Sequence, residues 1–426
     1  MSDASIPPAL DAELRRLAAE AAGQPLTESL GPGSPLAALM GRFVEIALEE
    51  ELTAHLGSPP GTRAPGSTNV RNGSSRKTLK TSHGPAEIKI PRDRESSFEP
   101  KILPKHRTMT ADLEARVTAM YAQGMTTRSI QRHVEELYHI QASEMLVTRI
   151  VDRLEPELQT WRSRELEATY PILFIDAIHY KVRHASGARR GVHSTAIYTV
   201  TGYDEKGQHR ILGIYAGSKG ETGEAATMWH QVLLDLKERG LHNPLIVTSD
   251  GLKGMRKALR AVYPEVVHLP CVVHLMRAAL RTVPAGQKKD IARQLKRIYQ
   301  AATPEAAEQA LNDAEDALRA RYGSTVTNGF RTAWPNLQQL WRFPAPLRKL
   351  VYTTNPVENV HGRMRGVTKN RGVFPSVDSA VRLLTLVADR IDKTNKAGGT
   401  RPDWPHIVTA LHLIFPGRLP TDWGRR

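Results

Sequence analysis

Cysteine is nearly absent from the sequence, since Cys271 is the only one among 426 residues. A single cysteine excludes an internal disulfide and also excludes a zinc finger built on cysteine pairs. This usage is typical of a protein from a reducing cytosol. A hydrophobic content of 40% is nevertheless high enough for apolar cores, and the length allows two or three domains.

Long apolar runs are also missing. No stretch of 18 apolar residues occurs, so the sequence predicts no membrane-spanning helix. The opening residues MSDASIPPALDAELRR lack the basic and apolar regions of a signal peptide. We therefore expect a cytoplasmic protein with no membrane partner.

Acidic residues are outnumbered. The chain has 59 Lys and Arg against 44 Asp and Glu, which gives a net charge of +15 and a pI near 9.9. A surplus of this size favours a polyanionic partner, nucleic acid being the first choice. A nucleotide cofactor is a weak alternative, because no G-x-G-x-x-G loop is present.

Three acids that lie far apart in the sequence are the main candidate site residues. Asp176 follows the apolar run 171–175, Asp250 follows the apolar run 244–249, and Glu358 lies within TTNPVENVHGRMRG. Both runs are short and predict buried strands that end at the acid. An isolated carboxylate in an apolar setting must be paired, protonated or bound to a metal. An ion-paired acid is the ordinary explanation for one such residue, and three together indicate a shared site.

Clustered carboxylates repel one another, by roughly 4 kcal/mol at 4 Å and an effective dielectric near 20. Hard cations such as Mg²⁺ between them remove that repulsion. The reaction that uses this arrangement is in-line phosphoryl transfer with two metal ions. Asp176, Asp250 and Glu358 are therefore predicted as metal ligands for two Mg²⁺ ions, with Mn²⁺ able to substitute.

The order of elements around the first two acids predicts the fold. After the strand at 171–175 come two apolar strands at 194–204 and 209–217, joined by the turn Glu205-Lys206-Gly207, and then a helix at 221–239. Three antiparallel strands, a helix and a fourth strand form the ribonuclease-H-like order. We expect an α/β (α+β) protein with this catalytic core.

The N-terminal part is predicted to be mostly helical. Helical periodicity occurs at 9–23 and 36–56, and packing within or between protomers is the favoured use of both helices. A basic stretch follows, with a β-hairpin predicted at 77–91, and it is either a solvated linker or a contact to the nucleic-acid backbone. Three short helices within 110–155, with Thr126 or Thr127 as an N-cap and Gly124 as a C-cap, suit a helix-turn-helix.

The region after Asp250 contains two further features. Cys271 and His274 have C-x-x-H spacing, but no second ligand pair for a structural zinc site is evident. Residues 277–350 are helical in pattern and interrupt the chain between the second and third acids. Trp334 and Trp341 within them are expected to pack in a core, with a base-stacking contact as the alternative.

Four ordered motifs resemble the Mutator-type transposases of bacterial insertion sequences. They are FIDAIHYKVR, SDGLKGMRKAL, LPCVVHLMR and VYTTNPVENVHGRMRGVTKNRGVFPS, and the similarity extends from about Asn69 to beyond Asp389. The resemblance implies that Asp176, Asp250 and Glu358 stand at the positions of a DDE triad. It also implies that Cys271 and His274 match a C-x-x-H signature, and that a helical insertion precedes the last acid. His184 is a departure, because relatives often carry an acid there.

Basic residues near the third acid are candidate DNA contacts. Between Asn359 and Val377 the chain has four cations and no acid, and Arg365 lies nearly two helical turns after Glu358. A solvated helix face is the alternative. The candidate DNA-binding residues are Arg363, Arg365, Lys369, Arg371, Lys181 and Arg183.

The predicted organisation has seven parts. They are N-terminal helices for packing or dimerisation (1–60), a basic segment with a β-hairpin (61–108), a helix-turn-helix-like DNA-binding unit (109–165), the first part of the core (166–275), a helical insertion (276–350), the second part of the core with the Glu358 helix (351–400) and a C-terminal tail (401–426).

The predicted function is that of a DNA transposase. It would bind the terminal inverted repeats of its insertion sequence and carry out Mg²⁺-dependent strand cleavage and strand transfer, as a homodimer on paired double-stranded DNA ends and target DNA. Bound to DNA, it would lie at the bacterial nucleoid. Two alternatives remain, a structure-specific nuclease of the same fold and a non-catalytic regulator derived from a transposase.

Overall fold

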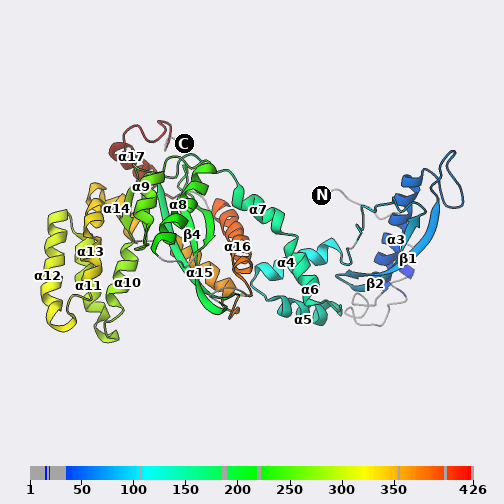
Figure 1. Cartoon of the computed structure of the whole chain (residues 1–426), viewed down its shortest axis with the longest axis horizontal. Coiled ribbons are helices and arrows are strands. Elements are labelled where there is room, and N and C mark those ends of the chain that lie inside the picture. The colour runs from blue at the N-terminus through cyan, green and yellow to red at the C-terminus, as the bar shows by residue number, and fades with distance from the viewer. Residues whose placement is uncertain are drawn as a thin grey trace. The chain divides into compact units, whose positions relative to one another are not determined.

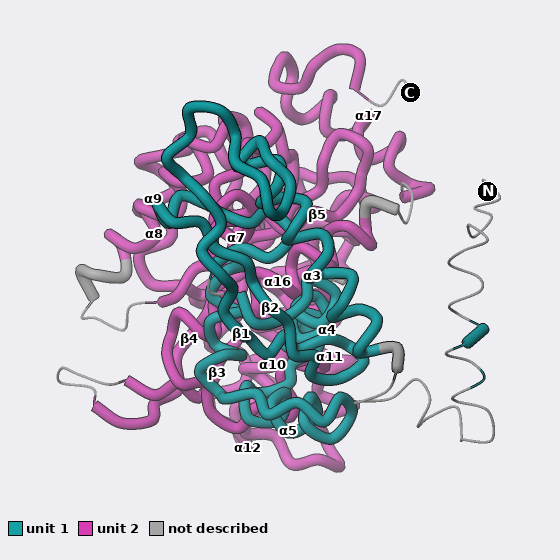
Figure 2. Tube along the Cα trace, turned by 90° about the vertical axis from the view of Figure 1, so that its right-hand side faces the viewer, with its two compact units in different colours: residues 1–154 teal, residues 155–426 magenta. Residues whose placement is uncertain are grey.

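The computed structural model describes residues 35–105, 107–184, 190–217, 222–353, 356–397 and 401–423, together with 15, 16 and 19. The helix predicted at 9–23 lies almost wholly outside these residues. The chain divides into two compact units, residues 1–154 and 155–426, drawn in different colours in Figure 2. Figure 1 labels their helices and strands. Each unit is described by itself.

Unit 1 begins with a helix packed on a β-hairpin. Helix α3 (Pro35–Leu56) contacts strands β1 (Arg71–Thr81) and β2 (Gly84–Asp93), which are antiparallel. Leu48 of α3 is buried with Leu79 and Ile88 of the hairpin. The predicted helix is confirmed, but the predicted hairpin was too short. The missed N-terminal half of β1 is mostly polar and exposed, so it carries no apolar alternation to reveal it.

Three short helices follow, as predicted: α4 (Ala111–Ala122), α5 (Thr127–Tyr138) and α6 (Glu144–Asp152). The side chain of Thr126 caps α5 by accepting a hydrogen bond from the Ser129 amide at 3.1 Å. Helix α4 ends one residue earlier than expected. Its C-cap is Gln123, and Gly124 follows in the left-handed region at φ 93°.

Unit 2 contains a five-stranded sheet in the order β5-β4-β3-β6-β7. Strands β3, β4 and β5 are antiparallel neighbours, whereas β6 and β7 run parallel to β3. The strands are β3 (Ile172–His184), β4 (Gly191–Tyr203), β5 (His209–Ala216), β6 (Ile246–Ser249) and β7 (Val267–Pro270).

The prediction that the first strand ends at Asp176 was wrong. Strand β3 continues eight residues beyond it because β4 pairs along its whole length, as far as the pair of His184 with Gly191. Only the parallel partner β6 stops, at the pair of Ile175 with Ser249. Asp176 therefore lies where β3 loses its neighbour on one side.

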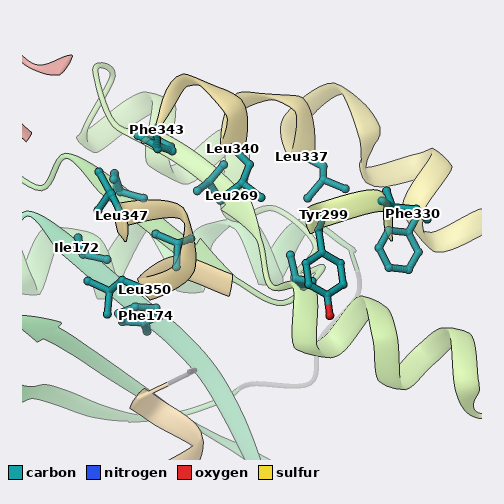
Figure 3. Close-up of a cluster of buried hydrophobic side chains, with 14 of the residues drawn as sticks. Ile172, Phe174, Leu269, Tyr299, Phe330, Leu337, Leu340, Phe343, Leu347 and Leu350 are labelled. Carbon is teal, nitrogen blue, oxygen red and sulfur yellow. The ribbon is translucent and has the colours of Figure 1, made fainter. Parts of the chain in front are cut away.

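Helices cover both faces of the sheet. Leu173 and Ile175 pack with helices α8 (Thr222–Glu238) and α9 (Met255–Val262) on one face. Because strand side chains alternate, Ile172 and Phe174 point to the other face, where they join the core formed with the later helices (Figure 3). Asp176 has the same parity as Phe174, so it faces those later helices.

The second face is covered by the insertion that the sequence predicts. Strand β7 is followed by α10 (Val272–Leu280), a short 3-10 turn η1 (Ala285–Gln287), α11 (Lys288–Gln300), α12 (Pro304–Tyr322), α13 (Asn328–Leu337), η2 (Gln338–Arg342) and α14 (Ala345–Thr353). A separate helix, α7 (Glu155–Ser163), precedes the first strand of the sheet.

Trp334 and Trp341, both within the insertion, pack on this core with their rings 5.9 Å apart, and the Trp341 indole donates to the carbonyl of Ala301. Core packing, the favoured interpretation of both tryptophans, fits these contacts.

Three helices complete the unit: α15 (Pro356–Thr368), α16 (Val377–Ala397) and α17 (Trp404–Ile414). Helix α15 packs on β3 and β4, and α16 packs along the edge strand β5. Asp392 of α16 accepts a hydrogen bond from the Ile211 amide at 3.1 Å and pairs with Arg210 at 3.2 Å. This contact covers part of an edge that would otherwise expose backbone groups.

Candidate active site

The sheet brings the first two predicted acids side by side. Ile175 of β3 and Ser249 of β6 are register partners, so the next residues, Asp176 and Asp250, occupy adjacent positions. Strand β7 adds Cys271 to the same row, because Pro270 pairs with Ser249 and the Cys271 amide donates to the Ser249 carbonyl at 2.8 Å. Residues 74 positions apart thus meet at the carboxyl ends of parallel strands, where sites in α/β folds commonly form.

Asp176 is held between two histidines. Its residue exposure is only 5%, yet Nε2 of His274 lies 3.6 Å from Oδ1 and Nδ1 of His361 lies 3.5 Å from Oδ2. Burial raises the pKa of Asp176, but the hydrogen bond from His361 and the neighbouring His274 lower it more, so the net pKa falls below its ordinary value. The carboxyl group therefore stays ionised at neutral pH.

His361 links the acid to the sheet. It is 1% exposed, and its Nε2 lies 3.1 Å from Oγ1 of Thr199, which is the cross-strand partner of Asp176 on β4. One ring thus contacts both members of a strand pair. These contacts fix where α15 crosses β3.

Glu358 lies one turn before His361 on α15, and its partner is an arginine. Nη1 of Arg277, on α10, is 2.5 Å from Oε1 of Glu358. The Arg277 side chain is 61% exposed and that of Glu358 is 28% exposed. The third predicted acid is therefore on the same side of the sheet as Asp176, in an ion pair that links α15 to α10.

Cys271 is a buried residue at the start of α10. It is 4% exposed and occupies the N-cap position of that helix. Burial, with smaller contributions from the charges of Asp176 and Asp250, raises the pKa of its thiol to about 11, so the thiol is protonated at neutral pH. Of the C-x-x-H pair, His274 is the residue that reaches an acid.

Within the described ranges, no three His, Cys, Asp or Glu side chains are arranged so that they could hold a metal ion. The chemistry of Asp176, Asp250 and Glu358 nevertheless matches Mg²⁺, which prefers carboxylate oxygens. Oε1 of Glu358 is buried and lacks a hydrogen bond, while the charge of Arg277 faces it. The donor set therefore fits a metal, and Glu358 is engaged with Arg277 in this state.

A cleft of about 430 Å³ opens beside the acids. Its lining includes Asp250, Cys271 and His274, together with Thr332 and Asn336 of α13. His268 and Ser249 also line it, and Nε2 of His268 lies 2.8 Å from Oγ of Ser249. Burial and the nearby Arg256 lower the pKa of His268 to about 4, so this ring is neutral at pH 7.

Comparison with known proteins identifies the family. The model named "Transposase, Mutator family" matches residues 14–398. The chain belongs to the Mutator family of transposases. Similar proteins include the probable transposase for insertion sequence element ISRM3-like of Sinorhizobium fredii, 33% identical over 93% of this chain and 96% of that protein. The transposase for insertion sequence element ISRM3 of Rhizobium meliloti is also 33% identical, with the same coverage. The transposase for IS256 in transposon Tn4001 of Staphylococcus aureus is 28% identical over 80% of this chain and 85% of that protein.

Membership of this family confirms the resemblance found in the sequence motifs. None of the helices in the described ranges is both long enough and apolar enough to cross a membrane.

The predicted DNA-contacting residues of this Mutator-family chain lie on the outer half of β3, on α15 and in the segment after α15. Lys181 and Arg183 are exposed on β3, and the backbone of both bonds to Phe374, which brings Arg371 to the same strand. The ring of Phe374 lies 5.6 Å from the Arg371 guanidinium. The remaining candidates, Arg363, Arg365 and Lys369, are exposed on α15 and just after it.

The charge of Arg365 acts on Tyr180 of β3, and the hydroxyl of Thr368 lies 3.5 Å from the Tyr180 hydroxyl. Burial raises the pKa of Tyr180, and Arg365 moderates that rise. Helix α15 therefore follows β3 from Asp176 outward, on the face that carries Asp176 and Tyr180. Lys181 and Arg183 have the opposite parity on β3 and point to the other face.

Three residues of the site were not predicted: Arg277, His361 and Thr199. A signal existed for two of them. Arg277 is three residues after His274 and His361 is three residues after Glu358, so each shares a helix face with a predicted residue. Thr199 could not be found in this way, because only the register of β4 identifies it as the partner of Asp176.

Proposed function

We propose that this protein is a DNA transposase that binds the terminal inverted repeats of an insertion sequence, cuts them, and joins the released ends to target DNA. The observation that carries the proposal is the adjacency of Asp176 and Asp250 at the end of the β3–β6 pairing, with Glu358 delivered to the same face by α15. Family membership supports the same reaction class.

The proposed core is ribonuclease-H-like. Three antiparallel strands, then helix α8, then strand β6 parallel to β3 support this assignment. Helices α4, α5 and α6 form the proposed helix-turn-helix. Met145, Thr148 and Arg149 lie on the exposed face of α6 and are available to enter a major groove.

The three carboxylates would hold Mg²⁺. Two such ions, when bound, activate an attacking oxygen and stabilise a leaving oxygen. The protein's own contribution starts with Asp176, which His274 and His361 keep ionised and oriented. Arg277 neutralises Glu358 in the DNA-free state, and its exposed guanidinium is placed to donate to a phosphate.

The proposed reaction has two balanced steps. Water attacks the phosphorus at the end of the element, one P–O bond forms as another breaks, and the products are a 3′-hydroxyl and a 5′-phosphate. The 3′-hydroxyl then attacks a second phosphodiester, so a new P–O bond again replaces an old one. Each attacking oxygen loses its proton and each leaving oxygen gains one.

A homodimer on paired DNA ends is part of the proposal. Phe43 and Ile46 lie on one face of α3, 66% and 48% exposed, and this apolar face suits helix packing between protomers. Terminal-repeat duplex would bind unit 1, and both partners would be double-stranded DNA.

The test uses the full chain, DNA that carries the ends of its own element, and Mg²⁺ or Mn²⁺. Asp176→Asn and Asp250→Asn should each lower single-turnover cleavage by a factor of roughly 1,000 or more, because an amide is a poor Mg²⁺ ligand, while repeat binding stays within about twofold. Asp316→Asn, at an acid of α12 that is 81% exposed, is the matched control and should cut normally.

Each outcome separates the alternatives. Wild-type cleavage rates in either aspartate variant would overturn the assignment of the acids. Cleavage without joining by the wild type would indicate a structure-specific nuclease. Sequence-specific binding with neither reaction would indicate a non-catalytic regulator.

A further inference from the structure

A groove lined by arginines adjoins the acidic cleft. It has a volume of about 270 Å³ and lies between α9, the start of β7 and the turn η2. Arg256, His268 and Asn336 line both this groove and the cleft at Asp250. The two hollows therefore form one continuous path away from the acids.

Three exposed cations line the groove: Arg256 and Arg260 from α9, and Arg342 from η2. None of them forms an ion pair with a carboxylate in the part of the chain that the structure describes. Arg342 donates only to the neutral amide of Gln339, at 3.1 Å. The one acid in the lining, Glu265, lies 3.5 Å from Arg418 and so has its own partner.

The fold holds two of these arginines in a fixed register. Gly254 begins α9 at φ 81°, and a Cβ there would meet the backbone of Ala226 at 2.7 Å, so α9 starts in close contact with α8. The inner face of α9 is buried through Met255 and Leu259. Arg256 and Arg260, four residues apart, must therefore share the outer face, with Cβ atoms about 6 Å apart.

We infer that this groove binds the phosphodiester backbone of the DNA strand on one side of the bond that is cut. Unpaired guanidinium groups on a concave surface focus positive potential, and their planar donors match phosphate oxygens. Asn336 and Gln339 add neutral donors to the lining. The inference rests on the proposed function, and it assigns a DNA subsite to arginines that are not among the predicted DNA contacts.

The groove variant is Arg256→Ala/Arg260→Ala/Arg342→Ala in the full chain. Binding of a terminal-repeat duplex without a divalent metal should lose affinity less steeply with salt. The log-log slope should shrink by about 2 to 3, because each phosphate contact contributes close to 0.9. Single-turnover cleavage with Mg²⁺ at saturating protein should fall by roughly 100-fold, since a displaced scissile phosphate reacts poorly.

The matched control removes the same charge elsewhere on unit 2, as Arg293→Ala/Arg297→Ala/Arg319→Ala. These residues are exposed on α11 and α12, and two of them pair with neighbouring acids. The control should keep the wild-type salt slope and cut within about twofold of the wild type. Equal slopes and equal rates for the groove and control variants would overturn the inference.

A second arm locates the contact on the DNA. Duplexes with a single neutral methylphosphonate at successive linkages around the scissile bond should slow the wild type at two or three linkages on one side only. The groove variant should be insensitive at those linkages and sensitive elsewhere. If the groove variant loses the same factor as the wild type at every linkage, the groove does not bind the backbone.

The experiment distinguishes failure of the proposed function from failure of the groove inference. A wild type that binds the duplex but cuts no substrate would overturn the transposase reaction, whereas the salt slopes of the groove and control variants would still decide whether the groove binds DNA.

Discussion

Asp176 is almost fully buried, with a histidine facing each of its two oxygens, whereas Glu358 is paired with an exposed arginine. The two acids therefore differ in how easily their partners can leave. His361 is held by its contact with Thr199, whereas the side chain of Arg277 is mostly exposed to solvent. Glu358 is therefore the acid of the three whose partner can most easily move away.

The charge of Arg277 should oppose metal binding to the DNA-free protein. Arg277→Ala removes a cation 2.5 Å from Glu358, so the affinity of the free protein for Mn²⁺ should rise by roughly 3-fold to 30-fold, as expected for an exposed charge in a high effective dielectric. Isothermal titration with Mn²⁺ measures the change. Arg277→Lys keeps the charge and is the control. Equal Mn²⁺ affinity in the alanine and lysine variants would count against a role for Glu358 as a ligand.

His209 at the start of β5 should make the stability of unit 2 depend on pH. Burial lowers its pKa to about 4, against an ordinary value near 6.5, and its Nε2 has no hydrogen-bond partner among the described residues. The unfolded chain therefore binds more protons between pH 6.5 and 4. The contribution to stability is complete above pH 6.5 and is lost as the pH falls towards 4, by up to about 1.4 kcal/mol per pH unit.

His209→Gln should flatten this dependence. We expect the difference in Tm between wild type and variant, measured by calorimetry from pH 7 to pH 4, to shrink as the pH falls. His406→Gln, at an exposed position of α17, is the control. If the Tm values of the wild type and the His209 variant change with pH in parallel, His209 does not titrate between pH 7 and pH 4.

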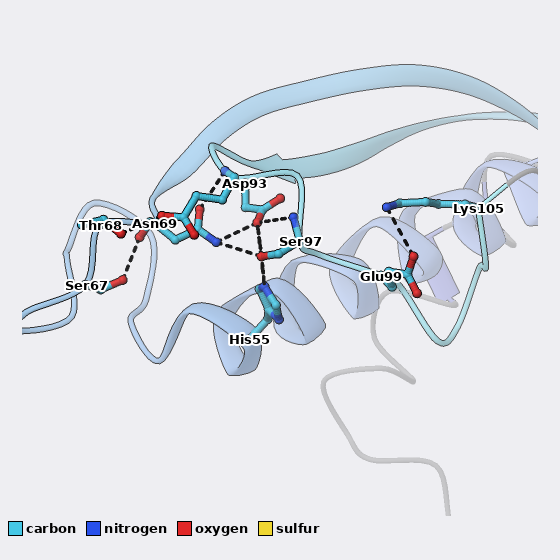
Figure 4. A network of polar contacts seen from close by, with 9 residues as sticks. His55, Ser67, Thr68, Asn69, Asp93, Ser97, Glu99 and Lys105 are labelled. Carbon is cyan, nitrogen blue, oxygen red and sulfur yellow. Dashed lines mark hydrogen bonds and ion pairs between the residues drawn. The ribbon is translucent and has the colours of Figure 1, made fainter.

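At the scale of elements, a buried carboxylate joins the hairpin to the loop that follows it and to α3. Oδ2 of Asp93 accepts hydrogen bonds from the Asn69 amide at 2.7 Å and from the Ser97 hydroxyl at 2.7 Å, and His55 of α3 lies 3.8 Å away (Figure 4). Burial raises the pKa of Asp93, but the hydrogen bonds from Asn69 and Ser97 hold it well below its ordinary value. The carboxylate is therefore ionised throughout the neutral range.

Asp93→Asn should destabilise unit 1 by about 1 to 3 kcal/mol at pH 7, because its new amide protons face donors and leave a buried group unsatisfied. Urea unfolding followed by circular dichroism measures the loss. The penalty should shrink as the pH falls below the ordinary aspartate pKa of 3.8, because the unfolded wild-type chain then binds a proton that the folded carboxylate does not bind. Glu99→Gln, at an acid that is 80% exposed, should cost less than about 0.5 kcal/mol. A similar cost for both variants would exclude the network as a source of stability.

The elements that the sequence predicts well are those with a recognisable apolar pattern, such as α3, β4 and α8. The length of β3 was missed because its outer half alternates basic and apolar residues, and nothing in that pattern marks where a neighbouring strand stops. The three acids could be chosen as candidates because each follows or lies near a recognisable motif. Their partners were harder to predict, since contacts such as that of His361 with Thr199 depend on register between segments 162 residues apart.

At the scale of the whole molecule, positive charge is unevenly distributed. Residues 1–154 carry 19 basic and 19 acidic side chains, whereas residues 155–426 carry 40 Lys and Arg against 25 Asp and Glu. The entire net charge of +15 therefore belongs to unit 2. The basic hairpin of unit 1 is offset by acids elsewhere in the same unit. Long-range attraction of DNA should come from the unit that holds the three carboxylates.

Because each unit has its own apolar core, we expect the two units to unfold separately. The apolar clusters around Leu48 and Leu52 belong to unit 1, and those around Phe174 and Leu173 belong to unit 2. Calorimetry of the full chain should resolve two transitions, with Asp93→Asn lowering one Tm and His209→Gln changing the other. A single transition that moves in both variants would show that the units unfold together.

The insertion between Asp250 and Glu358 also sets an order of events during protein synthesis. Translation at about 5 to 20 residues per second needs roughly 5 to 20 s to add the 108 residues that separate the two acids. Strands β3 and β6 can pair during that interval, while α15 and α16 are still unmade. A nascent or prematurely terminated chain therefore carries two of the three carboxylates and an uncovered β5 edge, and the proposed active site is completed only when the ribosome has nearly finished the chain.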